Sequence, residues 1–104
     1  MSLRKKQSKF VRMVADLIIF AYNNGYEMTV GDAWARAGHS PNSCHYIRLA
    51  IDLNLFNKDG KYLDKGPEME AAHGMLHDYW DSIGGGRRIS QDLNHYSLEE
   101  GGRR

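Results

Sequence analysis

Hydrophobic residues recur at helical spacing in two parts of the chain. Between Ser8 and Asn24 they form one broad stripe, which predicts an amphipathic helix that ends where Gly25 can adopt a left-handed cap. A second stripe begins after Pro67, a residue suited to a helix start, and ends at the glycines of residues 84–86. The positions that carry the two stripes are Phe10, Met13, Val14, Leu17 and Ala21, then Met69, Ala72, Met75, Leu76, Tyr79 and Trp80.

A different period appears between the two predicted helices. From Leu49 to Phe56 hydrophobic and other residues alternate, which is typical of a strand with one buried face. We also expect short strands at residues 26–30, 61–63 and 95–98, and a frayed tail over residues 99–104. Because helices and strands are segregated along the chain, the pattern predicts an α+β fold: a long N-terminal helix and a second helix packed on a short, mainly antiparallel sheet.

Composition narrows the classes of function. The chain has 104 residues, which suits one domain over residues 1–104. We expect a monomer, although the length itself does not fix the oligomeric state. Lys and Arg number 14 against 13 Asp and Glu, so the formal net charge of +1 indicates neither nucleic acid nor an anionic membrane as partner. The single cysteine, Cys44, excludes a disulfide within the chain and a four-cysteine zinc site. Residues 13–22 are too few for a membrane span, and we expect cytoplasmic synthesis without a signal peptide.

Two histidines and two aspartates form a first candidate site. His45 precedes the alternating strand, Asp52 stands on its polar face, and His95 opens the last predicted strand. A carboxylate in such a strand is costly to bury without a partner, and a metal ion is one such partner. Two histidines and an aspartate on zinc would leave a fourth position for water, as catalytic sites do. Asp92 could then act as general base, although scattered residues of these types are also common as simple polar surface.

The second predicted helix offers a competing candidate. Glu70, His73 and His77 share one face, and histidines four residues apart can bind zinc. The residue after the first histidine is Gly74, however, so the general base of an HExxH motif is missing. We therefore expect a solvated helix face here.

The segment from Val30 to Ala50 suggests another class of function. It is similar to a helix-turn-helix, with a turn at residues 37–41 and a recognition helix carrying Tyr46 and Arg48. The alternation that begins at Leu49 and the near-neutral charge argue against DNA binding, which stays as an alternative function.

The first candidate site, together with its flanking sequence, resembles the VanY-like zinc peptidases. These are D-alanyl-D-alanine carboxypeptidases and L-alanyl-D-glutamate endopeptidases that cut peptidoglycan stem peptides. Their pattern of Ser-x-His, six residues, Asp, and a later acid-x-x-His appears here as SCH at residues 43–45, Asp52, and DLNH at residues 92–95. Nearly the whole chain resembles short phage endolysin and prophage members, in the stretches KQSKFVRMVADLI, GYEMTVGDAW, RLAIDLNLF, DYWDSIGG and NHYSLEEGG.

The resemblance implies roles for six residues. His45, Asp52 and His95 would bind one zinc ion, and Asp92 would be the catalytic base, while Arg36 and Ser43 would contact substrate. The chain departs from the pattern at two places. Arg48 stands where the broader family has Gly, and Ala35 separates Trp34 from the Arg that often follows such an aromatic at once.

The implied function is zinc-dependent hydrolysis of peptidoglycan stem peptides. The favoured bond is L-alanyl-D-glutamate, cut by a phage-type endolysin that is made in the host cytoplasm and acts on the cell wall after release. A D-alanyl-D-alanine carboxypeptidase is the alternative within the same family. A free C-terminal carboxylate needs a fixed cation such as a bidentate Arg, and the shift of Arg36 from the expected position favours the internal cut.

Overall fold

The computed structural model describes all 104 residues of the chain. Two helices, α1 (Leu3–Asn23) and α2 (Gly66–Ser82), are combined with three strands, β1 (Glu27–Val30), β2 (Ala50–Phe56) and β3 (His95–Ser97), and a short 3-10 helix, η1 (Cys44–Ile47). The predicted α+β class is confirmed. Neither helix combines the length and the apolar character that crossing a membrane requires.

The strands form one antiparallel sheet in the order β1-β2-β3. β1 pairs with the second half of β2 and β3 with the first half, so that Asp52 lies directly opposite His95. Residues opposite each other in an antiparallel pair project to the same face of the sheet. The register therefore brings together two side chains that are 43 positions apart in the numbering.

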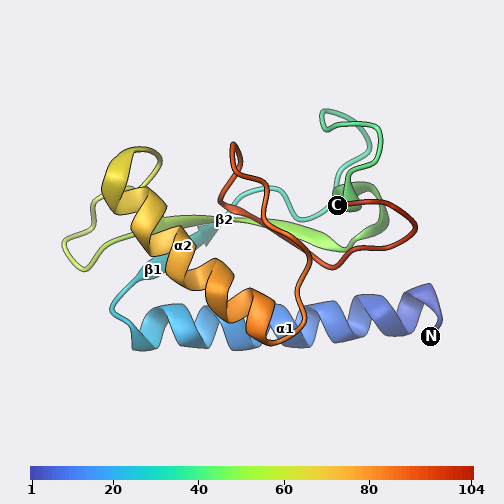
Figure 1. Cartoon of the computed structure of the whole chain (residues 1–104), viewed down its shortest axis with the longest axis horizontal. Coiled ribbons are helices and arrows are strands. Elements are labelled where there is room, and N and C mark those ends of the chain that lie inside the picture. The colour runs from blue at the N-terminus through green and yellow to red at the C-terminus, as the bar shows by residue number, and fades with distance from the viewer.

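Both helices contribute to the core on one face of this sheet. α1 runs along the length of the molecule, and α2 crosses it at an angle (Figure 1). Leu53 and Leu55 are fully buried, whereas Asp52 and Asn54, on the other face of β2, are half-buried. The alternation read from the sequence thus separates a hydrophobic face from a face that carries polar groups. Other fully or almost fully buried core residues are Leu17, Ala21, Leu49, Leu76, Trp80 and Tyr96.

Helix α1 starts earlier than predicted. It begins at Leu3 because the Ser2 hydroxyl accepts a hydrogen bond from the backbone N–H of Lys5 at 3.2 Å. The first turns are polar, so hydrophobic spacing could not reveal them, yet Gln7 donates to the carbonyl of Ile47 at 2.9 Å. The predicted return strand at 61–63 is reduced to a single bridge between Tyr62 and Phe56.

Two further expectations are wrong. Residues 30–50 contain no α-helix, only the four residues of η1, so the helix-turn-helix interpretation fails. The C-terminal tail is not frayed: the N–H of Arg104 donates to the carbonyl of Asn42 at 3.1 Å, and its carbonyl accepts from the N–H of Cys44 at 2.7 Å. The tail therefore holds the loop that leads to His45.

Candidate metal centre

Three separate elements supply the side chains of the candidate site. His45 is in η1, where the hydroxyl of Ser43 accepts a hydrogen bond from the backbone N–H of His45 at 3.1 Å. Asp52 lies in β2 and His95 begins β3, opposite Asp52. The structure thus brings together the three residues that the sequence pattern proposes as ligands.

The backbone of Asp52 is held on its other side as well. Its N–H donates to the carbonyl of Asp32 at 2.8 Å, and its carbonyl accepts from the N–H of Gly31 at 2.8 Å. A methyl group on Gly31 would lie 3.2 Å from Cβ of Asp52. Glycine therefore allows the chain beyond β1 to approach the carboxylate this closely.

Three potential ligand atoms converge on one point. Nε2 of His45 lies 3.1 Å from Oδ1 of Asp52 and 3.2 Å from Nδ1 of His95. The same nitrogen of His95 lies 3.4 Å from Oδ1 of Asp52. Zinc–ligand bonds of about 2.0–2.1 Å in a tetrahedral site place neighbouring ligand atoms about 3.3–3.4 Å apart. The three atoms therefore have nearly the spacing of one face of a zinc tetrahedron.

The electrostatics of the cluster also fit a cation. Burial raises the pKa of the Asp52 carboxyl, but hydrogen bonds from His45 and His95 outweigh burial and hold the pKa at about 2. Burial lowers the pKa of His45, yet the hydrogen bond and charge of Asp52 leave that pKa above its ordinary value. A proton and a metal ion therefore compete for the same nitrogen, and metal binding weakens in acid.

Each histidine ring also has a nitrogen that points away from the cluster. Nδ1 of His45 and Nε2 of His95 are buried and have no hydrogen-bond partner. Both atoms are on the far side of their rings from Asp52, so an ion bound by the three converging atoms would not contact them. Two imidazole nitrogens and one carboxylate oxygen suit zinc and other divalent transition metals. The residues present thus fit a metal ion.

His39 covers the outer side of His45 and was missed at the sequence level. The two imidazole rings stack with centroids 4.1 Å apart and an angle of 22° between their planes. Nε2 of His39 lies 3.0 Å from a carboxylate oxygen of Asp32, and its backbone is bonded to the hydroxyl of Tyr46 at both N–H and carbonyl. His39 lies in a loop with no recognisable spacing, so only the folded chain reveals this contact.

The other three predicted site residues, Asp92, Ser43 and Arg36, differ in their exposure and in their contacts. Asp92 is exposed, and its carbonyl accepts a hydrogen bond from the N–H of His95 at 3.1 Å. Ser43 is buried, and its hydroxyl caps η1. Arg36 is exposed, and its guanidinium lies over the ring of Trp34 at 5.4 Å. No hydrogen bond or ion pair joins Arg36 to the three potential ligands.

The expectation of a solvated face on α2 is wrong for its histidines. His73 and His77 are 1% and 0% exposed. Nδ1 of His73 lies 2.7 Å from the hydroxyl of Tyr96, and Nε2 of His77 donates to the carbonyl of Leu93 at 2.7 Å. The hydrophobic face of α2 is broader than its apolar residues indicate, and both imidazoles lie in it with hydrogen-bond partners of their own. Glu70 alone of this group is exposed.

Cys44 takes no part in the site. Burial raises the pKa of its thiol to about 11, so the sulfur stays protonated at neutral pH. The thiol is within 3.6 Å of the carbonyl of Leu98. Cys44 is therefore a packing residue, as its place beside His45 in the chain predicts.

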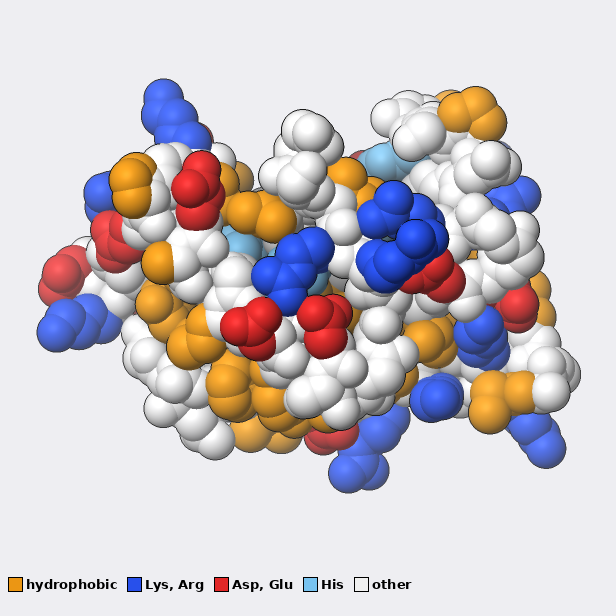
Figure 2. Space-filling model, viewed as in Figure 1, with side chains coloured by type: hydrophobic (Ala, Val, Ile, Leu, Met, Phe, Trp, Pro, Cys, Tyr) orange, Lys and Arg blue, Asp and Glu red, His pale blue; other side chains and the backbone are white.

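Comparisons with known proteins add no assignment: no protein-family model matches the chain, and neither does any curated protein. The geometry of the cluster and the residues around it are therefore what indicates a function. On the face shown in Figure 2, basic and acidic side chains are interspersed and only small areas of histidine are visible. The surface chemistry of that face is thus mixed, and the histidines lie mainly within the fold.

Proposed function

We propose that the chain is a zinc-dependent peptidase that hydrolyses peptidoglycan stem peptides. The observation that carries the proposal is the cluster of His45, Asp52 and His95, whose potential ligand atoms lie 3.1–3.4 Å apart. Three protein ligands with an open fourth position are typical of catalytic zinc. The sequence pattern shared with the VanY-like peptidases supports the choice of a peptide bond as the target.

The metal ion and Asp92 have separate roles in this chemistry. Zinc held by His45, Asp52 and His95 would supply Lewis acidity toward the attacking water and the scissile carbonyl. The carboxylate of Asp92 accepts the proton of the attacking water as the water oxygen bonds to the carbonyl carbon. The same carboxyl group then delivers that proton to the amine nitrogen as the carbon–nitrogen bond breaks.

We place the cut at the internal L-alanyl-D-glutamate bond. A carboxypeptidase has to hold a free C-terminal carboxylate, for which a fixed Arg is the usual device. Arg36 lies over Trp34, and the cleft next to the cluster is lined by carboxylates and amides without any Lys or Arg. An internal cut also opens a cross-linked wall, as a phage-type endolysin must after its release from the cytoplasm.

Metal analysis and peptidoglycan digestion test this proposal together. Purified protein should hold one zinc per chain by elemental analysis, and mass spectrometry of digested peptidoglycan should reveal new N-terminal D-glutamate. Loss of terminal D-alanine alone would assign the carboxypeptidase instead. Zinc-free protein that remains inactive when zinc is added would overturn the peptidase.

The role of Asp92 has its own test. Asp92→Asn should bind zinc almost normally and lose about 10²-fold or more in rate, because it removes the general base without touching a ligand. The matched control is Asp59→Asn, which makes the same chemical change in the turn at residues 57–60, outside the cleft. Full activity of Asp92→Asn would exclude Asp92 as the base.

A further inference from the structure

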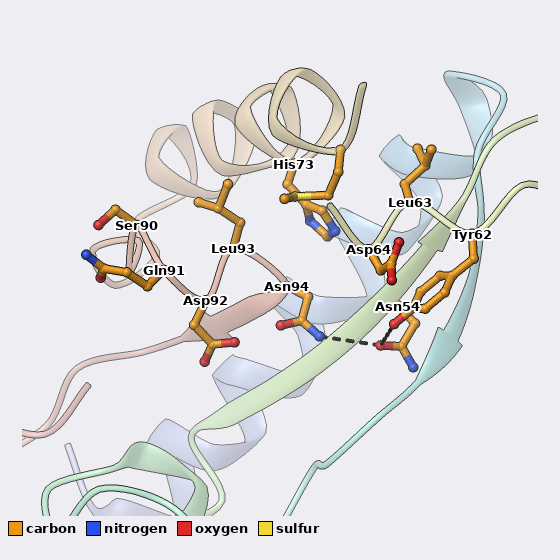
Figure 3. A pocket seen from close by; sticks show the side chains of 11 residues that line it. Asn54, Tyr62, Leu63, Asp64, His73, Ser90, Gln91, Asp92, Leu93 and Asn94 are labelled. Carbon is orange, nitrogen blue, oxygen red and sulfur yellow. Dashed lines mark hydrogen bonds between the residues drawn. The ribbon is translucent and has the colours of Figure 1, made fainter. Parts of the chain in front are cut away.

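A polar cleft of about 200 Å³ lies next to the candidate metal centre. Its walls come from β2, from α2 and from the loops that precede α2 and β3 (Figure 3). Asn54 in its wall is two residues beyond Asp52 on the same face of β2, and Asn94 directly precedes His95. None of the three proposed ligands lines the cleft itself, which adjoins them through these two asparagines.

The charge of the cleft is negative. Asp64 and Asp92 line it, and no Lys or Arg does, although Lys65 follows Asp64 in the chain. Neither carboxylate takes part in a salt bridge, whereas the nearby Lys61 is held by Glu68 at 3.5 Å. In Figure 3 the carboxylate of Asp64 lies between the side chains of His73 and Tyr62. Both carboxylates are therefore free to meet a cation from outside.

A buried donor faces the same space. His73 is 1% exposed and lines the cleft. The buried hydroxyl of Tyr96 lies 2.7 Å from Nδ1 of His73 and has no other hydrogen-bond partner, so the hydroxyl donates to this nitrogen. The proton of the neutral imidazole must then be on Nε2, and this nitrogen has no hydrogen-bond partner within the protein. It is an unpartnered N–H group for which a carbonyl oxygen is the natural acceptor.

We propose that this cleft is the subsite for a peptide residue whose side chain carries a primary ammonium group. Asp64 lies opposite the ammonium, and Nε2–H of His73 donates to a carbonyl oxygen of the peptide. The amides of Asn54 and Asn94, which are 3.4 Å apart, line the path from the metal ligands and can bond to the peptide backbone. A stem peptide that contains lysine or another diamino acid provides these groups.

This inference rests on the proposed peptidase function, and it makes that function more specific. Two carboxylates and no cation repel a free C-terminal carboxylate, so the cleft is suited to a chain that continues beyond the cut. The side-chain ammonium is then the feature that distinguishes the preferred peptide from others with the same scissile bond.

The test uses two peptides that differ only in one charge. The full, zinc-loaded chain is given L-Ala-γ-D-Glu-L-Lys-D-Ala and the same peptide with an acetylated lysine side chain. Acetylation should lower kcat/KM roughly tenfold, the scale of a partly enclosed ion pair. Asp64→Asn should remove this preference, and the control Asp59→Asn should keep it. Asp64→Lys should instead favour a peptide with glutamate in place of lysine.

Binding measurements keep the two proposals separable. Calorimetry with the wild type and with Asp92→Asn should give tighter binding of the lysine peptide than of its acetylated form, and the Nε2–H resonance of His73 should shift on binding. Equal cleavage of both peptides would overturn the subsite and leave the peptidase intact. Selective binding without cleavage would overturn the peptidase and retain the subsite. Neither binding nor cleavage would overturn both.

Discussion

Acid should destabilise the fold through the buried imidazole of His73. Burial is the main cause that lowers the pKa of His73 from 6.5 to about 4, and the charge of His77 adds to it. In the unfolded chain the same group has its ordinary pKa, so between these two values the unfolded state binds more protons. The free energy of unfolding therefore falls as the pH drops from about 6.5 to about 4, and this loss is complete below that range.

The magnitude follows from the difference between the two pKa values. Each pKa unit corresponds to about 1.4 kcal/mol. The lowering of the His73 pKa from 6.5 to about 4 therefore corresponds to about 3 kcal/mol in the free energy of unfolding. The free energy of unfolding of a small domain is about 5–15 kcal/mol, so protonation of this one imidazole would remove a large share of it. The hydroxyl of Tyr96 has to turn from donor to acceptor when Nδ1 of His73 takes up a proton.

Urea denaturation at a series of pH values from 7.5 to 4 measures the effect. A chelator keeps the protein free of metal, so that metal release does not contribute. The wild type should lose about 3 kcal/mol more than His73→Gln over this range. The lowered pKa of His77 acts in the same direction, but it is common to both proteins and largely cancels in the difference. Parallel stability curves, or a His73 ring that titrates near pH 6.5 in the folded protein by NMR, would refute the argument.

Three further predictions concern the metal centre and its supports. His45→Ala should abolish stoichiometric zinc binding by elemental analysis, whereas His77→Ala, although less stable, should retain it. Gly31→Ala should weaken zinc affinity at least about tenfold in a competition titration, because the new methyl would lie 3.2 Å from Cβ of Asp52. Arg48 has a φ of 58°, and its guanidinium lies 4.5 Å from the centroid of the Trp34 ring. Arg48→Gly and Arg48→Ala both lose this ring contact, but only glycine adopts the positive φ without strain. By urea denaturation, Arg48→Gly should be more stable than Arg48→Ala by about 1 kcal/mol.

The elements that could be predicted from the sequence are those in which hydrophobic residues recur at a regular spacing. The stripes of α1 and α2 and the alternation of β2 each reflect one element in contact with one core, and the structure contains all three. Asp52 was recognisable because a carboxylate in such a strand needs a partner. The position of Arg48 is also instructive: it adopts a left-handed conformation, which glycine adopts at lower cost and which no hydrophobic period indicates.

The parts that were not predictable depend on contacts between distant residues. No local signal indicates that the tail forms hydrogen bonds with Asn42 and Cys44. These bonds join backbone groups, which almost every residue type has, so the sequence does not reveal them. His39 stacks on His45 only after the loop between them has folded back. The burial of His73 was hidden for a related reason: a polar residue on a helix face reads as solvated unless its hydrogen-bond partner, here Tyr96, is known.

The four buried histidines show how partners, and not residue type, decide a role. Nε2 of His77 donates to the carbonyl of Leu93, which fixes the orientation of the ring and ties α2 to the loop that carries Asp92. His45 and His95 each direct a nitrogen at the same oxygen of Asp52, so one cation can take the place of the protons between these three atoms. The histidines of α2 are thus bonded to β3 and to the loop before it, and those of η1 and β3 are left available for a metal ion. A distance of four residues along a helix is weaker evidence for a metal site than two histidines that share one carboxylate.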